Sequence, residues 1–264
     1  MIRFSTNSFS WNTTYNVGLP ELDGPAICRE AAHCGAQGIE IDPSRVTAAD
    51  LREAGISLSG ASTGGPLFDE WTVAHEDGVV ATAAAARVLG AEYVFFTAAP
   101  KGGWGACEPV TRDNLKLAGE RFCTLAARVR AEGVVIGLHN HASNPDGFAA
   151  ELALVRDFVD PALVGLYFDM GWAYCSDADP VAVIGEFAPR LMGLHFRNHT
   201  PDRVPTQTLD EGALDMSAIA AALRAAGYSG WAALELWHRE DVPVSRSMAD
   251  CQAESLACLK ELLG

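Results

Sequence analysis

Four side chains that can bind a metal ion stand at or near the ends of short apolar runs in the second half of the chain. His139 follows VVIGL, Asp169 follows ALVGLYF, His195 lies in RLMGLHF and Glu235 lies in YSGWAALEL. Two imidazoles with two carboxylates suit Mn²⁺, Fe²⁺, Co²⁺ or Zn²⁺ better than Ca²⁺. We expect a divalent metal ion here, with Mn²⁺ as the first candidate and Mg²⁺ as a further one. Such a centre leaves coordination positions open for substrate oxygens.

The spacing of these residues predicts that they face a common centre. If the apolar runs are strands, residues of one parity face one side. The positions that share the parity of the four residues are Val135, Gly137, His139 and His141; Gly165, Tyr167 and Asp169; Gly193, His195 and Arg197; and Trp231, Ala233 and Glu235. The interleaved residues, Met192 and Leu194 among them, are apolar and suit a helix-facing side. In three of the four strands the preceding residue of the same parity is Gly or Ala, which is expected to leave space for a ligand or metal. Glu40, in GIEID, is expected to join this group.

A cation at this centre would polarise the carbonyl of a keto-sugar and stabilise the enediolate that forms when a neighbouring proton leaves. Glu235 is the candidate general base, and His141 or Glu40 is the candidate partner that returns a proton or assists a leaving hydroxyl. Arg197 would bind a substrate oxygen. Return of the proton gives isomerisation or epimerisation, whereas loss of a β-substituent gives dehydration. The ligand set does not separate these reactions.

Tryptophans also stand at or after predicted strand ends. They are Trp11, Trp104, Trp172 and Trp237. Their rings could form apolar walls that pack on the faces of a sugar, and we expect Trp104, Trp172 and Trp237 to bind substrate in this way. Ordinary packing at the rim of the fold is the alternative for each of them.

The elements that must position these residues repeat one pattern, in which a helical segment stops at a glycine or proline and a buried strand follows. The strand candidates are 2–9, 37–41, 56–60, 91–96, 134–138, 162–168, 190–196 and 228–236. Between them, Leu115, Ala118, Phe122, Leu125 and Val129 recur in helical steps of three and four. Eight such units predict an α/β fold, a single-domain (β/α)₈ TIM barrel over residues 1–264. An open doubly wound sheet is the alternative, but no G-x-G-x-x-G follows the first strand. Longer connections at about 62–77, 198–214 and 238–245 are expected to build the active-site face.

Composition excludes several classes of protein. Hydrophobic residues make up 49% of the 264 residues and charged residues 20%, and no apolar stretch approaches the roughly 18 residues of a membrane span. The first residues do not resemble a secretory signal, so we expect a cytoplasmic protein. The net charge of −15 disfavours nucleic acid as a partner. The seven scattered cysteines offer no C-x-x-C pair for a disulfide framework or thiolate site.

Around the predicted strand ends of the second half, the chain resembles the xylose isomerase-like barrel superfamily. This superfamily contains sugar and sugar-phosphate isomerases and epimerases, inosose dehydratases and endonuclease IV. The motifs that carry the resemblance are GLHNH, FDMGW, LHFRNH, LDEGALD and ALELW. The resemblance implies Asp169, His195 and Glu235 as metal ligands and Arg197 as a group near substrate oxygens. Many epimerases of the family carry a glutamate where this chain has His139. Either His139 takes the ligand role, or His141 takes it and His139 serves the substrate.

The favoured function is therefore a metal-dependent isomerase or epimerase of a keto-sugar or related polyol. A sugar dehydratase or lyase is the alternative, because a histidine in strand five leaves fewer opposed bases. A nuclease would need further ligands and a basic face, and a non-catalytic sugar-binding or partner barrel would need no turnover. The expected partner is a small-molecule sugar, and the sequence leaves homo-oligomerisation open. Few basic residues, chiefly Lys101, Arg197, Arg203 and Arg239, fall on the predicted loops, which makes a phosphorylated substrate less favoured.

Overall fold

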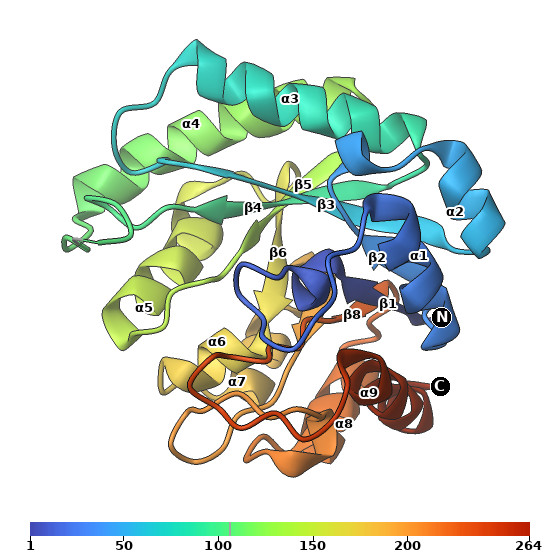
Figure 1. Ribbon diagram of the computed structural model, residues 1–264. Helices are drawn as coiled ribbons and strands as arrows, with labels where there is room; N and C mark the ends of the chain where they lie inside the picture. Colours follow the sequence, from blue (N-terminus) through green and yellow to red (C-terminus); the bar gives the residue numbers. More distant parts are fainter. Residues whose placement is uncertain (106) are drawn as a thin grey trace.

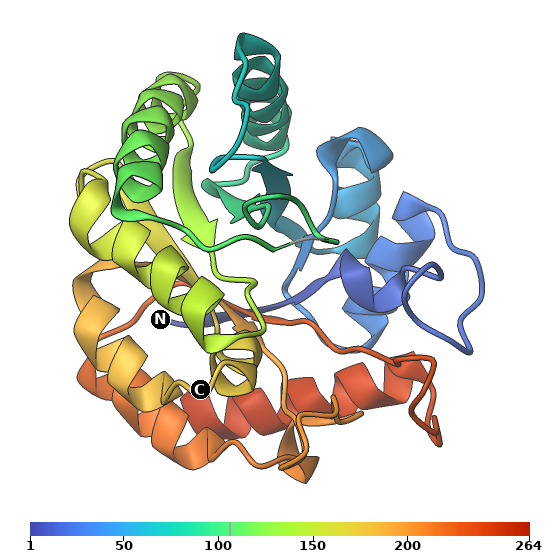
Figure 2. The same cartoon turned by 90° about the vertical axis from the view of Figure 1, so that its left-hand side faces the viewer.

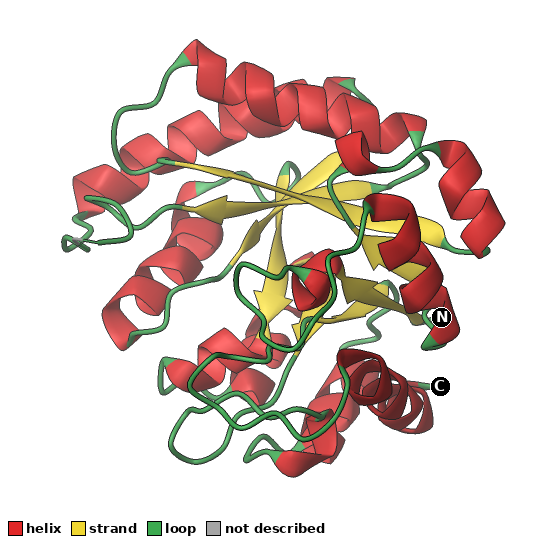
Figure 3. Cartoon of the chain, viewed as in Figure 1, coloured by secondary structure: helices red, strands yellow, loops and turns green. Residues whose placement is uncertain are grey.

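The computed structural model describes residues 1–105 and 107–264. Eight parallel strands pair in chain order and close into one barrel (Figures 1 and 3). They are β1 (Arg3–Asn7), β2 (Gly38–Glu40), β3 (Ser57–Gly65), β4 (Tyr93–Ala98), β5 (Val135–His139), β6 (Val164–Asp169), β7 (Leu191–Phe196) and β8 (Trp231–Leu234). The predicted (β/α)₈ barrel is thereby confirmed, and the open sheet is not formed.

Helices surround the barrel, as the end-on view of Figure 2 shows. They are α1 (Gly24–His33), α2 (Ala48–Ala54), α3 (Val73–Val88), α4 (Arg112–Ala131), α5 (Pro145–Ala153), α6 (Met170–Cys175), α7 (Pro180–Phe187), α8 (Met216–Ala225) and α9 (Met248–Leu263). The short helix α6 directly follows β6, before α7. Of the helices described, none is both long and apolar enough to cross a membrane.

The predicted helical periodicity corresponds to one buried face in α4. The hydroxyl of Thr111 caps the helix by accepting the N–H of Asn114, which satisfies a donor that the first turn leaves unpaired. The apolar positions Leu115, Ala118, Phe122, Leu125 and Val129 are all buried in the main core. The preceding stop signals also act as predicted, since Gly55 ends α2 in the left-handed conformation with φ of 72°.

The strand bounds differ from the prediction by one residue or more, and the ends of β3 and β8 bear on the site. β3 continues to Gly65 rather than ending at residue 60, so the connection before α3 is shorter than the expected 62–77. The added residues, Ala61 to Gly65, pair with β4. The hydrogen bonds of this pairing hold them in a strand although few of their side chains are apolar. β8 ends at Leu234, so Glu235 is the first residue after it, although the Glu235 N–H still donates to the Phe196 carbonyl at 3.0 Å.

The barrel interior is filled by an aromatic layer, and two expectations about it were wrong. Tyr93, Phe95, Tyr167 and Trp231 pack together there with Met192. Met192 was expected to face the helices, but the pairing of β6 with β7 shifts register between Leu166 and Tyr167. This irregularity turns Met192 inward, because an extra residue in a strand reverses the parity at that point.

The glycines of the inward positions do not leave space for a ligand. A Cβ on Gly193 would overlap the ring of Tyr167, and one on Gly137 would lie 3.0 Å from the sulfur of Met192. On the first half of the barrel, a Cβ on Gly38 would lie 2.7 Å from the ring of Trp231. These glycines accommodate large side chains that cross the barrel, so any ligand site must lie beyond this layer, toward the carboxyl ends of the strands.

Candidate metal centre

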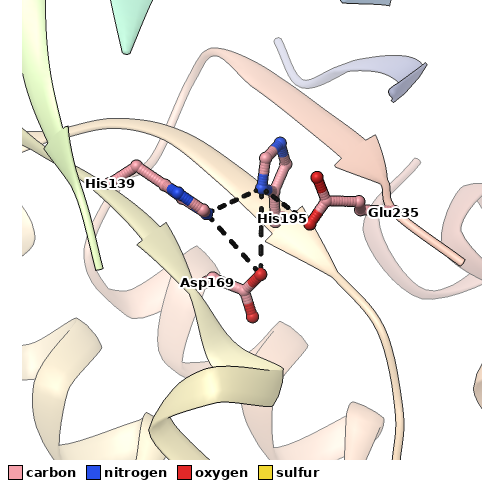
Figure 4. A group of neighbouring side chains, drawn as sticks. All are labelled: His139, Asp169, His195 and Glu235. Carbon is pink, nitrogen blue, oxygen red and sulfur yellow. Dashed lines mark hydrogen bonds and ion pairs between the residues drawn. The ribbon is translucent and has the colours of Figure 1, made fainter. Parts of the chain in front are cut away.

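The four predicted ligands meet at the carboxyl ends of β5 to β8 (Figure 4). One ligand atom from each of His139, Asp169, His195 and Glu235 lies within 4.8 Å of the others, and all four residues are buried. His139 Nε2 is 3.0 Å from His195 Nδ1 and 3.7 Å from Asp169 Oδ2, and His195 Nδ1 is 3.4 Å from Glu235 Oε2. The four residues that strand parity predicted to face a common centre therefore do lie together.

The protonation of these groups suits a cation. Burial lowers the pKa of His139 to about 4, so its imidazole is neutral and has a free lone pair near pH 7. Burial opposes ionisation of Asp169, but Arg197, His139 and His195 together hold its pKa below the ordinary value. Asp169 Oδ2 accepts no hydrogen bond of regular geometry from any described residue, although it forms an ion pair with Arg197. A buried carboxylate oxygen that is not fully satisfied, among two imidazoles and a second carboxylate, fits a divalent transition-metal ion.

Arg197 was expected to bind a substrate oxygen, but the structure places its guanidinium against the carboxylates of the cluster. Its Nη2 is 2.8 Å from Asp169 Oδ2 and also forms an ion pair with Glu235. The guanidinium is buried and packs over the ring of Trp172, with 5.1 Å between its central carbon and the ring centroid. Arg197 therefore offsets the charge of two carboxylates in the cluster.

Glu40 lies behind the centre, against His195. Its Oε2 is 2.7 Å from His195 Nε2 and accepts the amide of Asn7 at 2.9 Å, while Oε1 accepts the hydroxyl of Tyr167. Only 1% of Glu40 is exposed, so a substrate at the open end of the barrel does not reach it. This arrangement fixes His195 with Nδ1 toward the cluster.

The partners that hold the two imidazoles were not singled out in the sequence. Asn7 and Tyr167 hold Glu40, and Thr97 Oγ1 lies 3.1 Å from His139 Nδ1. Each lies in a strand neighbouring the residue it holds or across the barrel from it. Tyr167 shares the inward parity of Asp169, and Asn7 ends the first strand, which are the signals that could have indicated them.

His141 stands apart from the four ligands, at the wall of a neighbouring cavity. The cavity has a volume of about 730 Å³, and His141, Trp104 and Trp172 line it. The ring of His141 lies 4.9 Å from Trp172, 5.2 Å from Trp104 and 5.7 Å from His139, centroid to centroid. Burial lowers the pKa of His141 to about 3. The structure thus places His139 in the cluster and His141 between the cluster and the cavity.

The remaining tryptophans are placed differently. Trp237 does not line this cavity, because it packs edge-on against Phe9 and donates its indole N–H to the carbonyl of Tyr15 at 2.8 Å. Trp11 is buried in the main core. Of the predicted sugar-binding rings, Trp104 and Trp172 are therefore the two that the structure brings to one cavity.

Known proteins resemble this chain in sequence over part or most of its length, and in fold over all of it. An inosose dehydratase of Lacticaseibacillus casei is 26% identical over 137 residues, which cover 44% of this chain and 46% of that protein. The rhizopine catabolism protein MocC of Rhizobium meliloti is 24% identical over 267 residues, with 89% and 81% covered. The structure of L-ribulose 3-epimerase superposes with a TM-score of 0.79 at 20% identity, over 100% of this chain and 95% of that one.

These similarities differ in what they cover. The match to the inosose dehydratase spans about half of its length, and the likeness to the epimerase is one of fold. The family model described as xylose isomerase-like TIM barrel matches residues 28–262, nearly the entire barrel. The chain therefore belongs to the xylose isomerase-like TIM barrel family.

Proposed function

We propose that this protein is a metal-dependent isomerase or epimerase that acts on a keto-sugar or related polyol through an enediolate. The convergence of His139, Asp169, His195 and Glu235 at the carboxyl end of the barrel carries this proposal. Similarity to an inosose dehydratase, and a fold shared with L-ribulose 3-epimerase, support carbohydrate chemistry at this end of the barrel.

The four residues would hold the cation, Mn²⁺ first among the candidates. When bound, it supplies an electrophile that polarises a substrate carbonyl and stabilises the charge that develops on its oxygen. His195 is held by Glu40 and His139 by Thr97, so the imidazoles are oriented before a substrate arrives. Glu40 is thus a positioning residue in this proposal, rather than the proton carrier expected from the sequence.

Glu235 is the proposed general base. Its side chain is 11% exposed, whereas those of His139, Asp169 and His195 are at most 3% exposed. It is therefore the carboxylate of the cluster that a substrate reaches from the open end of the barrel. Arg197 forms an ion pair with this carboxylate and orients it beside the cluster. His141 stands on the cavity side. Burial keeps its imidazole neutral, so in this proposal it relays to the substrate a proton that it takes up from solvent.

A dehydratase is the second candidate, and one observation at the centre favours it. At the strand-five position this chain places a neutral imidazole, His139, rather than a second carboxylate opposite Glu235. One accessible carboxylate suffices to remove a proton, and His141 would relay a solvent proton to the departing hydroxyl, which leaves as water. The similarity to an inosose dehydratase agrees with this reading.

Elemental analysis tests the centre directly. Protein purified without added metal or chelator is compared with Asp169→Ala, His195→Ala and the control His33→Ala, whose histidine is exposed on α1. We expect about one equivalent of Mn, Fe, Co or Zn in the wild type and control, and loss of it in both centre variants while circular dichroism is retained. A wild-type protein that binds none of these metals when they are supplied would overturn the proposal and favour a non-catalytic barrel.

Activity assays then separate the two reactions. Keto-sugars and inososes are incubated with the metal-replete protein in D₂O. Exchange of a carbon-bound proton with retention of the carbon skeleton and hydroxyl count supports isomerisation or epimerisation, whereas loss of water gives an unsaturated product with new ultraviolet absorbance. Glu235→Gln, which keeps the side-chain volume, is expected to lose either activity.

A further inference from the structure

The 730 Å³ cavity beside the centre has no assigned ligand so far, although His141 in its wall has a proposed role in proton transfer. The cavity lies at the same end of the barrel, among the loops after β3, β4 and β5, the start of α4, the length of α5, and Trp172 of α6. In Figure 2 the chain that follows β4 runs across the front of the barrel at this end. Its volume falls within the roughly 300–1,000 Å³ of pockets that enclose drug-sized ligands.

The wall of the cavity is mainly apolar. Phe68, Val110, Leu115, Ala150 and Ala153 contribute to it from four separate segments. The cationic side chain among the described lining residues, Lys101, is paired with Glu108 and lies 3.8 Å from Asp69. Asp146 adds a further acidic group. An apolar wall with its lysine already neutralised favours an uncharged ligand over a phosphate.

Two polar atoms mark the side of the cavity nearest the metal centre. His141 Nδ1 and Trp172 Nε1 are both buried, and neither has a hydrogen-bond partner within residues 1–105 and 107–264. Trp172 is tied to the centre, since its backbone N–H donates to Asp169 Oδ1 at 2.9 Å. Buried polar atoms without partners are rare, because leaving them unpaired is costly. Both atoms are also out of contact with solvent, so they lie behind the wall that the rings of His141 and Trp172 form between the cavity and the centre.

We infer that the substrate is a neutral glycoside, a carbohydrate that carries an apolar substituent of about the size of an aromatic ring. The sugar lies at the centre, and the substituent passes the rings of His141 and Trp172 to fill the cavity. The position of the sugar rests on the proposed function. The assignment of the apolar substituent to the cavity rests only on the residues that line the cavity. The carboxylates of Glu108 and Asp146 in the cavity wall disfavour a phosphate or another anionic ligand.

Isothermal titration calorimetry with phenyl and methyl glucosides, each in both anomers, tests this assignment. None of these probes is a ketone, so none can be enolised and the measurement does not depend on turnover. In the protein as purified, we expect a phenyl glucoside to bind at least about tenfold more tightly than the matching methyl glucoside, because the additional carbons are removed from water. The comparison isolates the substituent even where glucose is not the preferred sugar.

Matched variants locate the effect. Ala150→Phe fills the cavity from α5, and Ala85→Phe places the same ring on the exposed outer surface of α3. The phenyl preference should fall severalfold in Ala150→Phe and persist in Ala85→Phe. Equal affinity for phenyl and methyl glucosides in the wild type would overturn the inference, as would a preference that Ala150→Phe leaves unchanged. A wild type that binds no metal yet prefers phenyl glucosides would overturn the proposed function alone.

Discussion

The carboxylate of Glu40 lies 2.7 Å from Nε2 of His195, while Nδ1 of the same ring lies among the other three predicted ligands. One imidazole thus connects a buried carboxylate on β2 to the centre at the ends of β5 to β8. A carboxylate in this position fixes the tautomer and the orientation of a metal-binding histidine and raises its basicity.

Glu40→Gln should therefore weaken metal binding without dismantling the barrel. The amide keeps the volume of the side chain but removes the charge that holds the His195 Nε2–H. We expect the metal affinity to fall about 10- to 100-fold, measured by competition with a chelator of known affinity. Glu53→Gln, at an exposed position of α2, is the control. Unchanged metal affinity in Glu40→Gln, with thermal unfolding of the metal-free protein also unchanged, would contradict the positioning role.

His139 and His141 should separate metal binding from turnover. His139→Gln removes a ring nitrogen from the cluster, so we expect metal affinity to fall at least as far as in Glu40→Gln. His141→Gln should retain the metal and lower turnover by about 10²- to 10⁴-fold, as expected for loss of a proton-transferring group. Metal content and kcat are measured on both variants. Metal loss in His141→Gln with retention in His139→Gln would assign the ligand role to His141.

The packing of the barrel interior predicts opposite effects for two glycine substitutions. A Cβ on Gly193 would overlap the ring of Tyr167, so Gly193→Ala should lower the free energy of unfolding by about 1–3 kcal/mol. Gly185, in α7, has no atom within 4 Å of the added Cβ, and Gly185→Ala should raise stability by about 0.5–1 kcal/mol. Urea titrations with equal m-values measure both effects. Equal stability of the two variants would show that Tyr167 moves away without cost.

Glu151 makes stability depend on pH. Both of its carboxylate oxygens accept the backbone N–H of His141, and burial raises its pKa from 4.5 to about 8. Between these values the folded protein keeps a proton that the unfolded chain has released. The free energy of unfolding therefore falls as the pH rises through this window, by up to about 1.4 kcal/mol per pH unit.

Comparison of Glu151→Gln with the wild type isolates this contribution, because all other titrating groups are shared. The difference in the free energy of unfolding should shift in favour of Glu151→Gln as the pH rises from 4.5 to 8, and become constant outside that range. Denaturant titrations at successive pH values measure it, and the exposed Glu53→Gln should give a flat difference. A flat difference for Glu151→Gln would show that the carboxyl is ionised throughout this range.

Much of the fold follows from patterns between neighbouring residues. Runs that are apolar on both faces and stop signals such as Gly55 predicted eight parallel strands and a closed barrel, which the structure confirms. Strand parity also predicted that Asp169 and Glu235 would meet the two histidines. These features are determined locally, because a period of two or 3.6 residues is set by the backbone itself.

Contacts across the barrel were decided only by the tertiary structure. The register shift at β7 turned Met192 inward, Tyr167 filled the space beside Gly193, and Glu40 came to rest behind His195 instead of facing a substrate. The pairing of Arg197 with two carboxylates of the cluster is another contact that the sequence did not predict. Such contacts depend on the register, bulges and side-chain volumes of all eight strands together, and a single shift in one strand reverses which residues face the centre.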